Sequence, residues 1–395
     1  MRFLLALVVL SSIAACGRGD GPAQSVASES EQTAAPADAN RLAALREDAS
    51  TEEFELAVQP RAFEFPRDHG PHPTFRHEWW YVTGHLDAAT GEPFGFELTF
   101  FRFALKPPQV SQGDGPAPSA WRARQIYMAH FAVTDIERGE FHVAERFARD
   151  ALGLAGARAQ PFRVSLDDWF LGAPVATGAN APAWRLVAAD KGYSLDIELH
   201  PASPIILNGD AGLSRKAATE GAASYYYSIP RMTAKGRLIR DGKSLDVEGT
   251  VWLDREWGSG SLGANQQGWD WFALQLDDGS ALMFYALRAR DGQRDPHSAG
   301  TWLAPDGTTR ALTSADVQIT TTAEWTSPRG GRYPARWQLR VPSLNLDVDI
   351  NPRLADQELN TSTRYWEGAS LVSGTRDEKK ITGKAYVELV GYATR

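Results

Sequence analysis

Two short segments of the chain place carboxylates beside large aromatic side chains. One is the run His-Glu-Trp-Trp at 77–80, and the other is the run Asp-Arg-Glu-Trp at 254–257. If the second run is a strand, alternation puts Asp254 and Glu256 on one face. A carboxyl group that is removed from water has a raised pKa and can donate a proton. We therefore treat Asp254 and Glu256 as candidate catalytic acids; an arginine–carboxylate network that ties two lobes together is the alternative interpretation of both runs.

Aromatic side chains near these acids suggest an apolar ligand. The chain has 13 Trp, 11 Tyr and 17 Phe, most of which a folded protein uses as core. Flat apolar walls with a few polar groups are typical of a site for a hydrophobic small molecule. The residues that we expect to contact such a ligand are Glu78, Trp80, Tyr226, Arg231, Trp257, Trp269 and Trp271.

Charge and motifs argue against several other functions. The formal net charge of −8 does not attract nucleic acid. The sequence contains no nucleophile elbow, phosphate-binding loop or dinucleotide fingerprint. Among the eight histidines, His77 and His85 would stand about 26 Å apart along one strand, too far to share an ion. We therefore expect no nucleic-acid partner, no metal and no cofactor.

The elements that must position these residues are strands. From about residue 60, Trp, Tyr, Phe, Val and Thr recur in short runs that Gly, Asp, Asn and Pro interrupt, as in strands separated by turns. We predict one hairpin from strands at 80–86 and 94–100. We predict a second hairpin from strands at 269–276 and 281–288, joined by Asp-Asp-Gly-Ser.

Three pairs of similar segments indicate a diverged internal duplication. The paired segments are 78–79 with 256–257, 195–201 with 346–352, and 249–254 with 383–388. The second pair is strengthened by a tryptophan before each copy, at Trp184 and Trp337. A duplication of this kind produces two lobes of like fold. Chance similarity between strand sequences is the alternative.

Together these signals predict an all-β protein of two antiparallel lobes, each a barrel or sandwich, packed side by side. Antiparallel sheets avoid open edges by curling or by packing face to face. A barrel of about eight strands has just enough interior for one small ligand. We place the N-terminal lobe at 59–238 and the C-terminal lobe at 239–395.

The first residues have the order of features found in bacterial lipoprotein signals. Arg2 precedes an apolar run at 3–10, and small residues then lead to Cys16, the only cysteine of the chain. This run is too short to cross a bilayer, so we expect 1–15 to be a cleaved signal peptide and Cys16 to be acylated. Residues 16–58 are expected to form a flexible tether. The predicted location is the periplasmic face of the cell envelope, and by resemblance to enterobacterial sorting signals Gly17 favours the outer membrane.

Six motifs taken together resemble the lipocalin-like AttH family, which is related to the carotenoid hydratases (hydroxyneurosporene synthases). The motifs lie at His77–Leu86, Phe94–Arg102, Tyr127–Asp135, Ser224–Ser228, Trp252–Gly258 and Gly268–Phe272. The resemblance covers roughly residues 60 to 395. It implies a two-lobed lipocalin-like fold with a cavity for a lipid, isoprenoid or similar ligand, and an accessory role beside an ABC-transporter permease.

The hydratase relatives imply a second hypothesis, a cofactor-free enzyme. They add water to a C=C bond of an acyclic isoprenoid, which requires a desolvated acid and aromatic faces around the carbocation. Their Asp-His-Asn-Trp-Gly run is Asp-Arg-Glu-Trp-Gly at 254–258 here, and the aspartate of their later Tyr-x-Asp is absent near Tyr285. These departures weigh against carotenoid hydration itself. The resemblance thus implies a membrane-anchored binding protein first, and a hydratase-like acid–base enzyme as the alternative.

Overall fold

The computed structural model describes residues 54–108, 124–174, 183–260 and 262–393. The predicted signal peptide, Cys16 and most of the predicted tether lie outside these residues. The last five residues of the predicted tether, 54–58, are described, and Phe54 and Ala57 among them are buried against the folded part. Two short 3-10 helices are present in the described chain, η2 (Arg67–His69) and η3 (Pro342–Leu344), and neither is long and apolar enough to cross a membrane.

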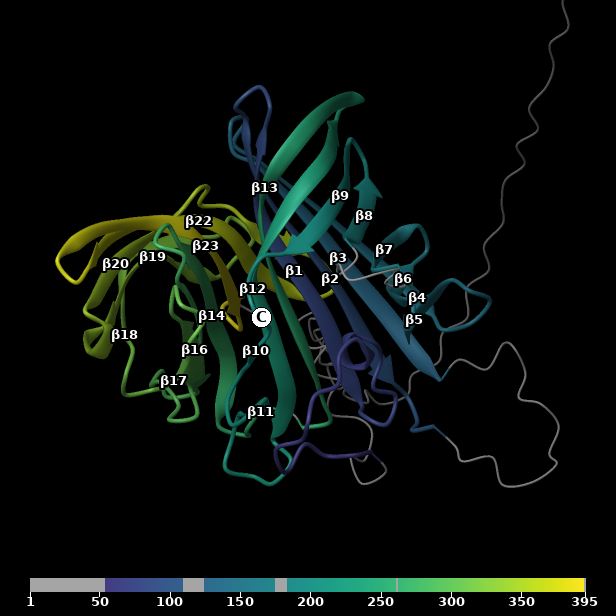
Figure 1. Ribbon diagram of the computed structural model, residues 1–395, viewed down its shortest axis with the longest axis horizontal. Helices are drawn as coiled ribbons and strands as arrows, with labels where there is room; N and C mark the ends of the chain where they lie inside the picture. The colour runs from purple at the N-terminus through teal and green to yellow at the C-terminus, as the bar shows by residue number, and fades with distance from the viewer. Residues whose placement is uncertain (1–53, 109–123, 175–182, 261, 394–395) are drawn as a thin grey trace, which may run out of the picture. The chain divides into compact units, whose positions relative to one another are not determined.

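Thirteen strands of the described residues form the first sheet, which curls around the N-terminal core (Figure 1). The main path runs β4-β3-β2-β1-β13-β12-β9-β8-β7-β6-β5, and β10 and β11 both pair with β12. Every pairing is antiparallel, including that of β1 with β13, which brings the two ends of this lobe's sequence together. The strands are β1 (His77–Ala88), β2 (Pro93–Ala104), β3 (Gln125–Asp135), β4 (Glu140–Arg149), β5 (Ala155–Ala159), β6 (Phe162–Leu166), β7 (Trp169–Gly172), β8 (Trp184–Asp190), β9 (Tyr193–Pro201), β10 (Ile206–Leu207), β11 (Leu213–Arg215), β12 (Ala223–Arg240) and β13 (Lys243–Gly258).

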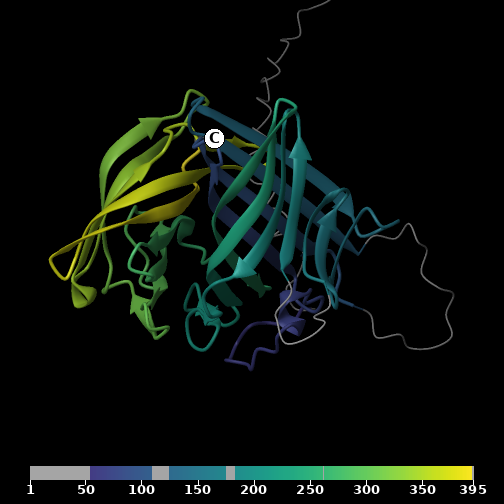
Figure 2. The same ribbon diagram turned by 45° about the horizontal axis from the view of Figure 1, so that its top comes forward.

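Ten strands of the described residues form the second sheet, which also curves around its own core (Figure 2). Its path runs β17-β16-β15-β14-β23-β22-β20-β19-β18, and β21 pairs with β22. The strands are β14 (Gln266–Leu276), β15 (Ala281–Ala289), β16 (Ala299–Leu303), β17 (Thr309–Thr313), β18 (Gln318–Thr326), β19 (Arg332–Val341), β20 (Leu346–Pro352), β21 (Glu358–Asn360), β22 (Arg364–Arg376) and β23 (Lys379–Val390). The prediction of two curled antiparallel lobes is confirmed, as are both predicted hairpins, β1–β2 and β14–β15.

The two sheets have the same strand order, so the duplication extends to the topology. Strands β1, β13, β12, β9 and β8 of the first sheet occupy the places of β14, β23, β22, β20 and β19 in the second. Two of the three predicted segment pairs therefore match: 195–201 with 346–352, and 249–254 with 383–388. The third is wrong. Residues 78–79 and 256–257 lie on neighbouring strands of one sheet, where Glu78 pairs with Trp257.

The change of lobe falls later in the chain than the sequence predicts. The predicted boundary at 238/239 would put β13 into the C-terminal lobe, but β13 lies between β1 and β12 in the first sheet. The second sheet begins with β14 at Gln266. The physical reason is that β12 and β13 form one long hairpin, and β13 supplies the hydrogen bonds that β1 would otherwise lack on that edge.

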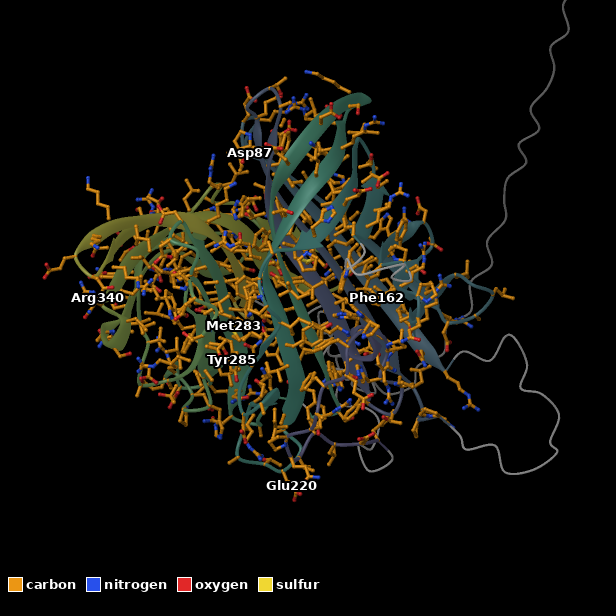
Figure 3. All side chains as sticks on the ribbon, viewed as in Figure 1. Asp87, Phe162, Glu220, Met283, Tyr285 and Arg340 are labelled. Carbon is orange, nitrogen blue, oxygen red and sulfur yellow. The ribbon has the colours of Figure 1, made fainter. Side chains whose placement is uncertain are left out.

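Each lobe has its own apolar core, and a third cluster lies between them. The first core fills the space inside the first sheet, and the second core fills the curve of the second sheet. The third cluster joins outward-facing side chains of both sheets, among them Tyr81, Trp252, Met283 and Tyr285. Figure 3 shows Met283 and Tyr285 near the middle of the two lobes, whereas Arg340 lies at the outer side of the second. This interlobe layer contains the candidate site.

Candidate active site

A partly enclosed cavity of about 120 Å³ lies between the lobes. Its volume is similar to that of an engineered apolar cavity of roughly 150 Å³ that holds benzene. Strands β1, β12 and β13 form one wall, and β14, β15, β22 and β23 form the other. The lining residues are His77, Trp79, Tyr81, Phe101, Lys216, Ala223, Ser224, Tyr226, Asp254, Glu256, Gly260, Leu262, Trp269, Trp271, Tyr285, Leu287, Tyr365, Glu367 and Glu388.

Asp254 is the most perturbed acid on the wall formed by the first lobe. Its side chain is buried, and Ser228 Oγ and Trp252 Nε1 donate hydrogen bonds to Oδ1 at 2.5 and 2.7 Å. The Tyr226 hydroxyl donates to Oδ2. Burial raises the pKa of Asp254 to about 7, although these three donors act to lower it. At neutral pH this carboxyl group is therefore divided between its protonated and ionised forms.

Glu256 lies two residues further along β13 and has a partly buried cation, Lys216, as its partner. Lys216 Nζ is 3.2 Å from Glu256 Oε1, and the Ser224 hydroxyl donates to the same oxygen. The ammonium group also lies 3.8 Å from the centre of the Tyr285 ring. Burial acts to lower the pKa of Lys216, but Glu256, Tyr285 and Asp254 together outweigh it and leave the pKa raised. The pair thus brings one charge of each sign to the cavity.

The wall formed by the second lobe carries two more acids. Glu367 of β22 and Glu388 of β23 are cross-strand partners, and both line the cavity. The Tyr81 hydroxyl donates to Glu367 at 2.8 Å, and Trp269 Nε1 donates to Glu388 at 2.9 Å. Burial, together with repulsion from Glu388 and Glu97, raises the pKa of Glu367 well above its usual range. Glu367 therefore holds its proton more tightly than an ordinary glutamate does.

The two walls use the same strand positions of the duplicated fold. Asp254 pairs across the sheet with Tyr81, and Glu388 pairs with Trp271 in the equivalent place. The equivalent residues, first lobe then second, are Trp79 and Trp269, Tyr81 and Trp271, Tyr226 and Tyr365, and Asp254 and Glu388. The cavity is thus built where two similar surfaces face each other, and each contributes a carboxylate, a tyrosine and large aromatic rings.

Comparison with known proteins identifies the relatives of this arrangement. The family model described as AttH-like matches residues 56–392. The chain belongs to the AttH-like family. A crystal structure of a provisional AttH protein from Nitrosomonas europaea has 36% identity to this AttH-like chain, covers 86% of it and 100% of its own length, and superposes with a TM-score of 0.75.

A more distant solved structure shares the fold alone. Kievitone hydratase from Nectria haematococca has 17% identity, a TM-score of 0.64, and coverage of 87% of this chain and 97% of its own. A search of curated protein sequences gave no significant match. The comparisons therefore confirm the family and the lipocalin-like fold that the motifs implied.

The AttH-like fold brings together five of the residues singled out from the sequence. Asp254, Glu256, Tyr226, Trp269 and Trp271 all line the interlobe cavity. Strand alternation explains the grouping, because Tyr226 lies on the face of β12 opposite Tyr225 and Tyr227, both of which belong to the core of the first lobe.

Three others lie on the opposite face of the same strands. Glu78, Trp80 and Trp257 are fully buried inside the first lobe and do not line the cavity. Arg102 and Arg255 both form ion pairs with Glu78, and Arg255 lies 3.9 Å from the centre of the Trp80 ring. This network joins strands of the first lobe only. It does not tie the two lobes together.

Arg231 lies away from the cavity, at the irregularity of β12 between Ile229 and Met232. Its Nη2 donates to the carbonyl oxygen of Leu276 at 3.0 Å and so joins β12 to the end of β14. Within the described residues, no group of three His, Cys, Asp or Glu side chains could hold a metal ion.

Several lining residues were not among those chosen from the sequence. Lys216 follows β11 in a loop with no recognisable motif, and Glu367 and Glu388 lie in strands whose pairing sequence alone does not fix. The sequence did contain one signal for Glu388. The segments 249–254 and 383–388 are similar, and Glu388 has the place in the second segment that Asp254 has in the first, so the candidate acid of one copy predicts an acid in the other.

Proposed function

We propose that this protein is a cofactor-free acid–base enzyme that adds water to, or removes it from, a C=C bond of an apolar substrate. The observation that carries the proposal is Asp254, a buried carboxyl group with a pKa of about 7 on the wall of an aromatic cavity. Perturbed acids in clefts concentrate at catalytic sites, and a catalytic acid works best when its pKa is near the working pH.

The lining supports a reaction through a carbocation. In the hydration direction, the proton of Asp254 moves to one alkene carbon, and the π electrons of the double bond form the new C–H bond. The rings of Trp269 and Trp271 are suited to stabilise the positive charge that develops on the other carbon. A water molecule then forms the C–O bond and loses one proton to a base.

The size of the cavity limits what part of the substrate enters it. A volume of about 120 Å³ holds a group of roughly benzene size, such as the unsaturated end of an isoprenoid. A longer chain or ring system would extend out of the open side. The shared fold of kievitone hydratase, a hydratase by name, supports the reaction class, and kievitone itself is a reasonable first probe.

Incorporation of oxygen from labelled water tests the proposal. Purified protein is incubated in H₂¹⁸O with kievitone and with a panel of acyclic isoprenoids, and products are analysed by mass spectrometry. We expect one probe to gain one labelled oxygen, and Asp254→Asn to abolish this. Asp270→Asn is the matched control, because Asp270 is also buried with a raised pKa of about 6 but does not line the cavity. Equal turnover by wild type and Asp254→Asn would reject the assignment.

A carrier of hydrophobic ligands is the second candidate, and the N-terminal sequence favours it. The run Ile13–Cys16 predicts a lipid anchor, which would hold the cavity near a membrane at the periplasmic face of the envelope, beside an ABC-transporter permease. The carrier hypothesis expects native mass spectrometry to find an apolar molecule bound and released unchanged. Labelling of cells with a fatty-acid probe, compared with Cys16→Ser, tests the anchor separately.

A further inference from the structure

A chain of three side chains leads from the wall of the cavity into the first lobe. Tyr365 of β22 lines the cavity, and its hydroxyl lies 2.6 Å from His130 Nδ1 of β3. His130 Nε2 lies 2.9 Å from Glu145 Oε1 on the neighbouring strand β4. His130 is fully buried, and its two ring nitrogens both have partners in this chain. The backbone N–H and the hydroxyl of Ser362 hold the Glu145 carboxylate at 3.1 and 2.6 Å.

The far end of this chain reaches a second, polar cavity. Glu145 and Ser362 line a cavity of about 560 Å³ between β4 and the segment around β21, together with Arg329, Asp356 and Glu358. The Glu145 side chain is 18% exposed, whereas that of His130 is 0% exposed. The three residues thus connect the aromatic cavity to the polar one through the fully buried imidazole of His130.

The positions of the protons follow from the partners. Burial acts to raise the pKa of Glu145, but hydrogen bonds from His130 and Ser362 outweigh it and lower the pKa, so Glu145 is an ionised acceptor. A carboxylate acceptor at Nε2 favours the tautomer with the proton on Nε2, in which Nδ1 accepts from the Tyr365 hydroxyl. Burial, with Glu97 and Glu367, raises the pKa of Tyr365 well above its usual range, so Tyr365 holds its proton between turnovers.

We propose that Glu145, His130 and Tyr365 form a proton relay, and that the Tyr365 hydroxyl is the base that takes the proton from the attacking water. The proposal rests on the function proposed above. The order of carboxylate, imidazole and hydroxyl is that of the serine hydrolase triad, in which the imidazole accepts the hydroxyl proton as the hydroxyl reacts. Tyr365 is the catalytic residue here, and His130 and Glu145 act through it.

The protons balance over one hydration. Asp254 gives its proton to the alkene carbon, and water gives its oxygen to the carbocation. One water proton moves to the Tyr365 oxygen while the Tyr365 proton moves to His130 Nδ1, and the imidazolium is paired with Glu145. The Nδ1 proton then returns to Tyr365 as the Tyr365 proton passes back to the cavity, where the ionised Asp254 takes one proton up; this restores the Nε2–H tautomer and leaves no net proton.

A purely structural bond between lobes is the competing explanation. The lobes are joined by other buried hydrogen bonds, such as that from His85 Nε2 to the carbonyl oxygen of Ala385 at 2.9 Å. That bond involves one ring nitrogen and a backbone acceptor that cannot take up a proton. His130 differs because a phenolic hydroxyl and a carboxylate hold its two nitrogens at once.

The decisive variants separate hydrogen bonding from proton transfer. His130→Gln retains one donor and one acceptor in a similar volume but cannot be protonated, and Tyr365→Phe removes the hydroxyl alone. Tyr386→Phe is the matched control: Tyr386 lies on the neighbouring strand, is buried without a hydrogen-bond partner among the described residues, and does not line the cavity. The variants are assayed as full chains with kievitone and the isoprenoid panel in H₂¹⁸O.

We expect His130→Gln and Tyr365→Phe to lower kcat about 100-fold with little change in KM, as for loss of a general base, while Tyr386→Phe turns over like wild type. NMR of the ligand-free protein with ¹⁵N-labelled histidine should show His130 as the Nε2–H tautomer. An Nδ1–H tautomer overturns the relay whatever the activity. If the tautomer is as expected but both variants have the kcat of wild type, the relay has no role in catalysis. If wild type itself shows no turnover, the proposed function and the catalytic role of the relay are both overturned.

Discussion

Replacement of Asp254 by Asn should stabilise the protein at high pH while it removes activity. The amide is nearly the same size as the carboxyl group, and its oxygen can still accept from Ser228 and Trp252. The Tyr226 hydroxyl can accept from the new NH₂ group instead of donating to Oδ2. The substitution therefore removes a titratable proton and keeps a hydrogen-bond partner for Ser228, Trp252 and Tyr226.

The magnitude follows from the pKa of Asp254. Its value of about 7 in the folded protein lies above the ordinary 3.8, so the folded state binds the proton more tightly than the unfolded state. Asp254 thus adds stability at low pH that is lost as pH rises through about 7. The gap of about three pH units corresponds to roughly 4 kcal/mol, of which about 3 kcal/mol falls between pH 5 and pH 8.

Urea unfolding at pH 5 and pH 8 measures this directly, because the contributions of all other groups cancel when wild type and Asp254→Asn are compared. We expect the free energy of unfolding of the variant, relative to wild type, to increase by about 3 kcal/mol from pH 5 to pH 8. Asp306→Asn is the control: hydrogen bonds from Thr308 lower the pKa of this exposed carboxylate, so it does not titrate in that range. A difference between wild type and Asp254→Asn that is the same at both pH values would refute the reasoning.

Three further predictions concern turnover and the frame of the site. Turnover in the hydration direction should decline as pH rises above about 7, because the proton donor Asp254 becomes ionised, and initial rates from pH 5 to pH 9 would show it. Glu78→Gln should cost about 3–5 kcal/mol in urea unfolding because it leaves two buried guanidinium groups without a countercharge. Gly249→Ala should cost about 1–3 kcal/mol, since its Cβ would lie 1.9 Å from the carbonyl oxygen of His85, whereas Gly156→Ala meets open space and should change the melting temperature little.

The fold could be predicted because its signals are local. Alternating aromatic and polar residues define the hairpins β1–β2 and β14–β15 within about twenty residues each, and short turns fix their register. The similarity between 249–254 and 383–388 also predicted a real structural equivalence, because each segment lies in the second strand of an equivalent hairpin. That Asp254 and Glu256 lie on one face of the sheet could be predicted from the alternation of side chains along a strand alone.

The other features of the site could not be predicted from the sequence, because they depend on contacts between strands that lie far apart in the chain. The pairing of β1 with β13 crosses more than 150 residues, and it alone shows that Glu78 faces the core of the first lobe while Glu256 faces the second lobe. His130 is similar. Between Ala129 and Phe131 it has the sequence context of an ordinary strand residue, and the sequence does not indicate that it contacts the hydroxyl of Tyr365, 235 residues later.

The duplication explains how one fold supplies an acid and a base to the same cavity. Tyr226 and Tyr365 occupy equivalent positions in the two lobes, so both side chains line the space between them. Their partners differ: Tyr226 donates to the carboxyl group of Asp254, whereas Tyr365 is hydrogen-bonded to the imidazole of His130. A hydration needs a proton donor and a proton acceptor at opposite ends of a double bond. Two copies of one strand pair meet that requirement once the hydrogen-bond partner of each tyrosine has diverged, to Asp254 in one case and His130 in the other. Replacement of a single partner, as in His130→Gln, should therefore remove the base and leave the acid.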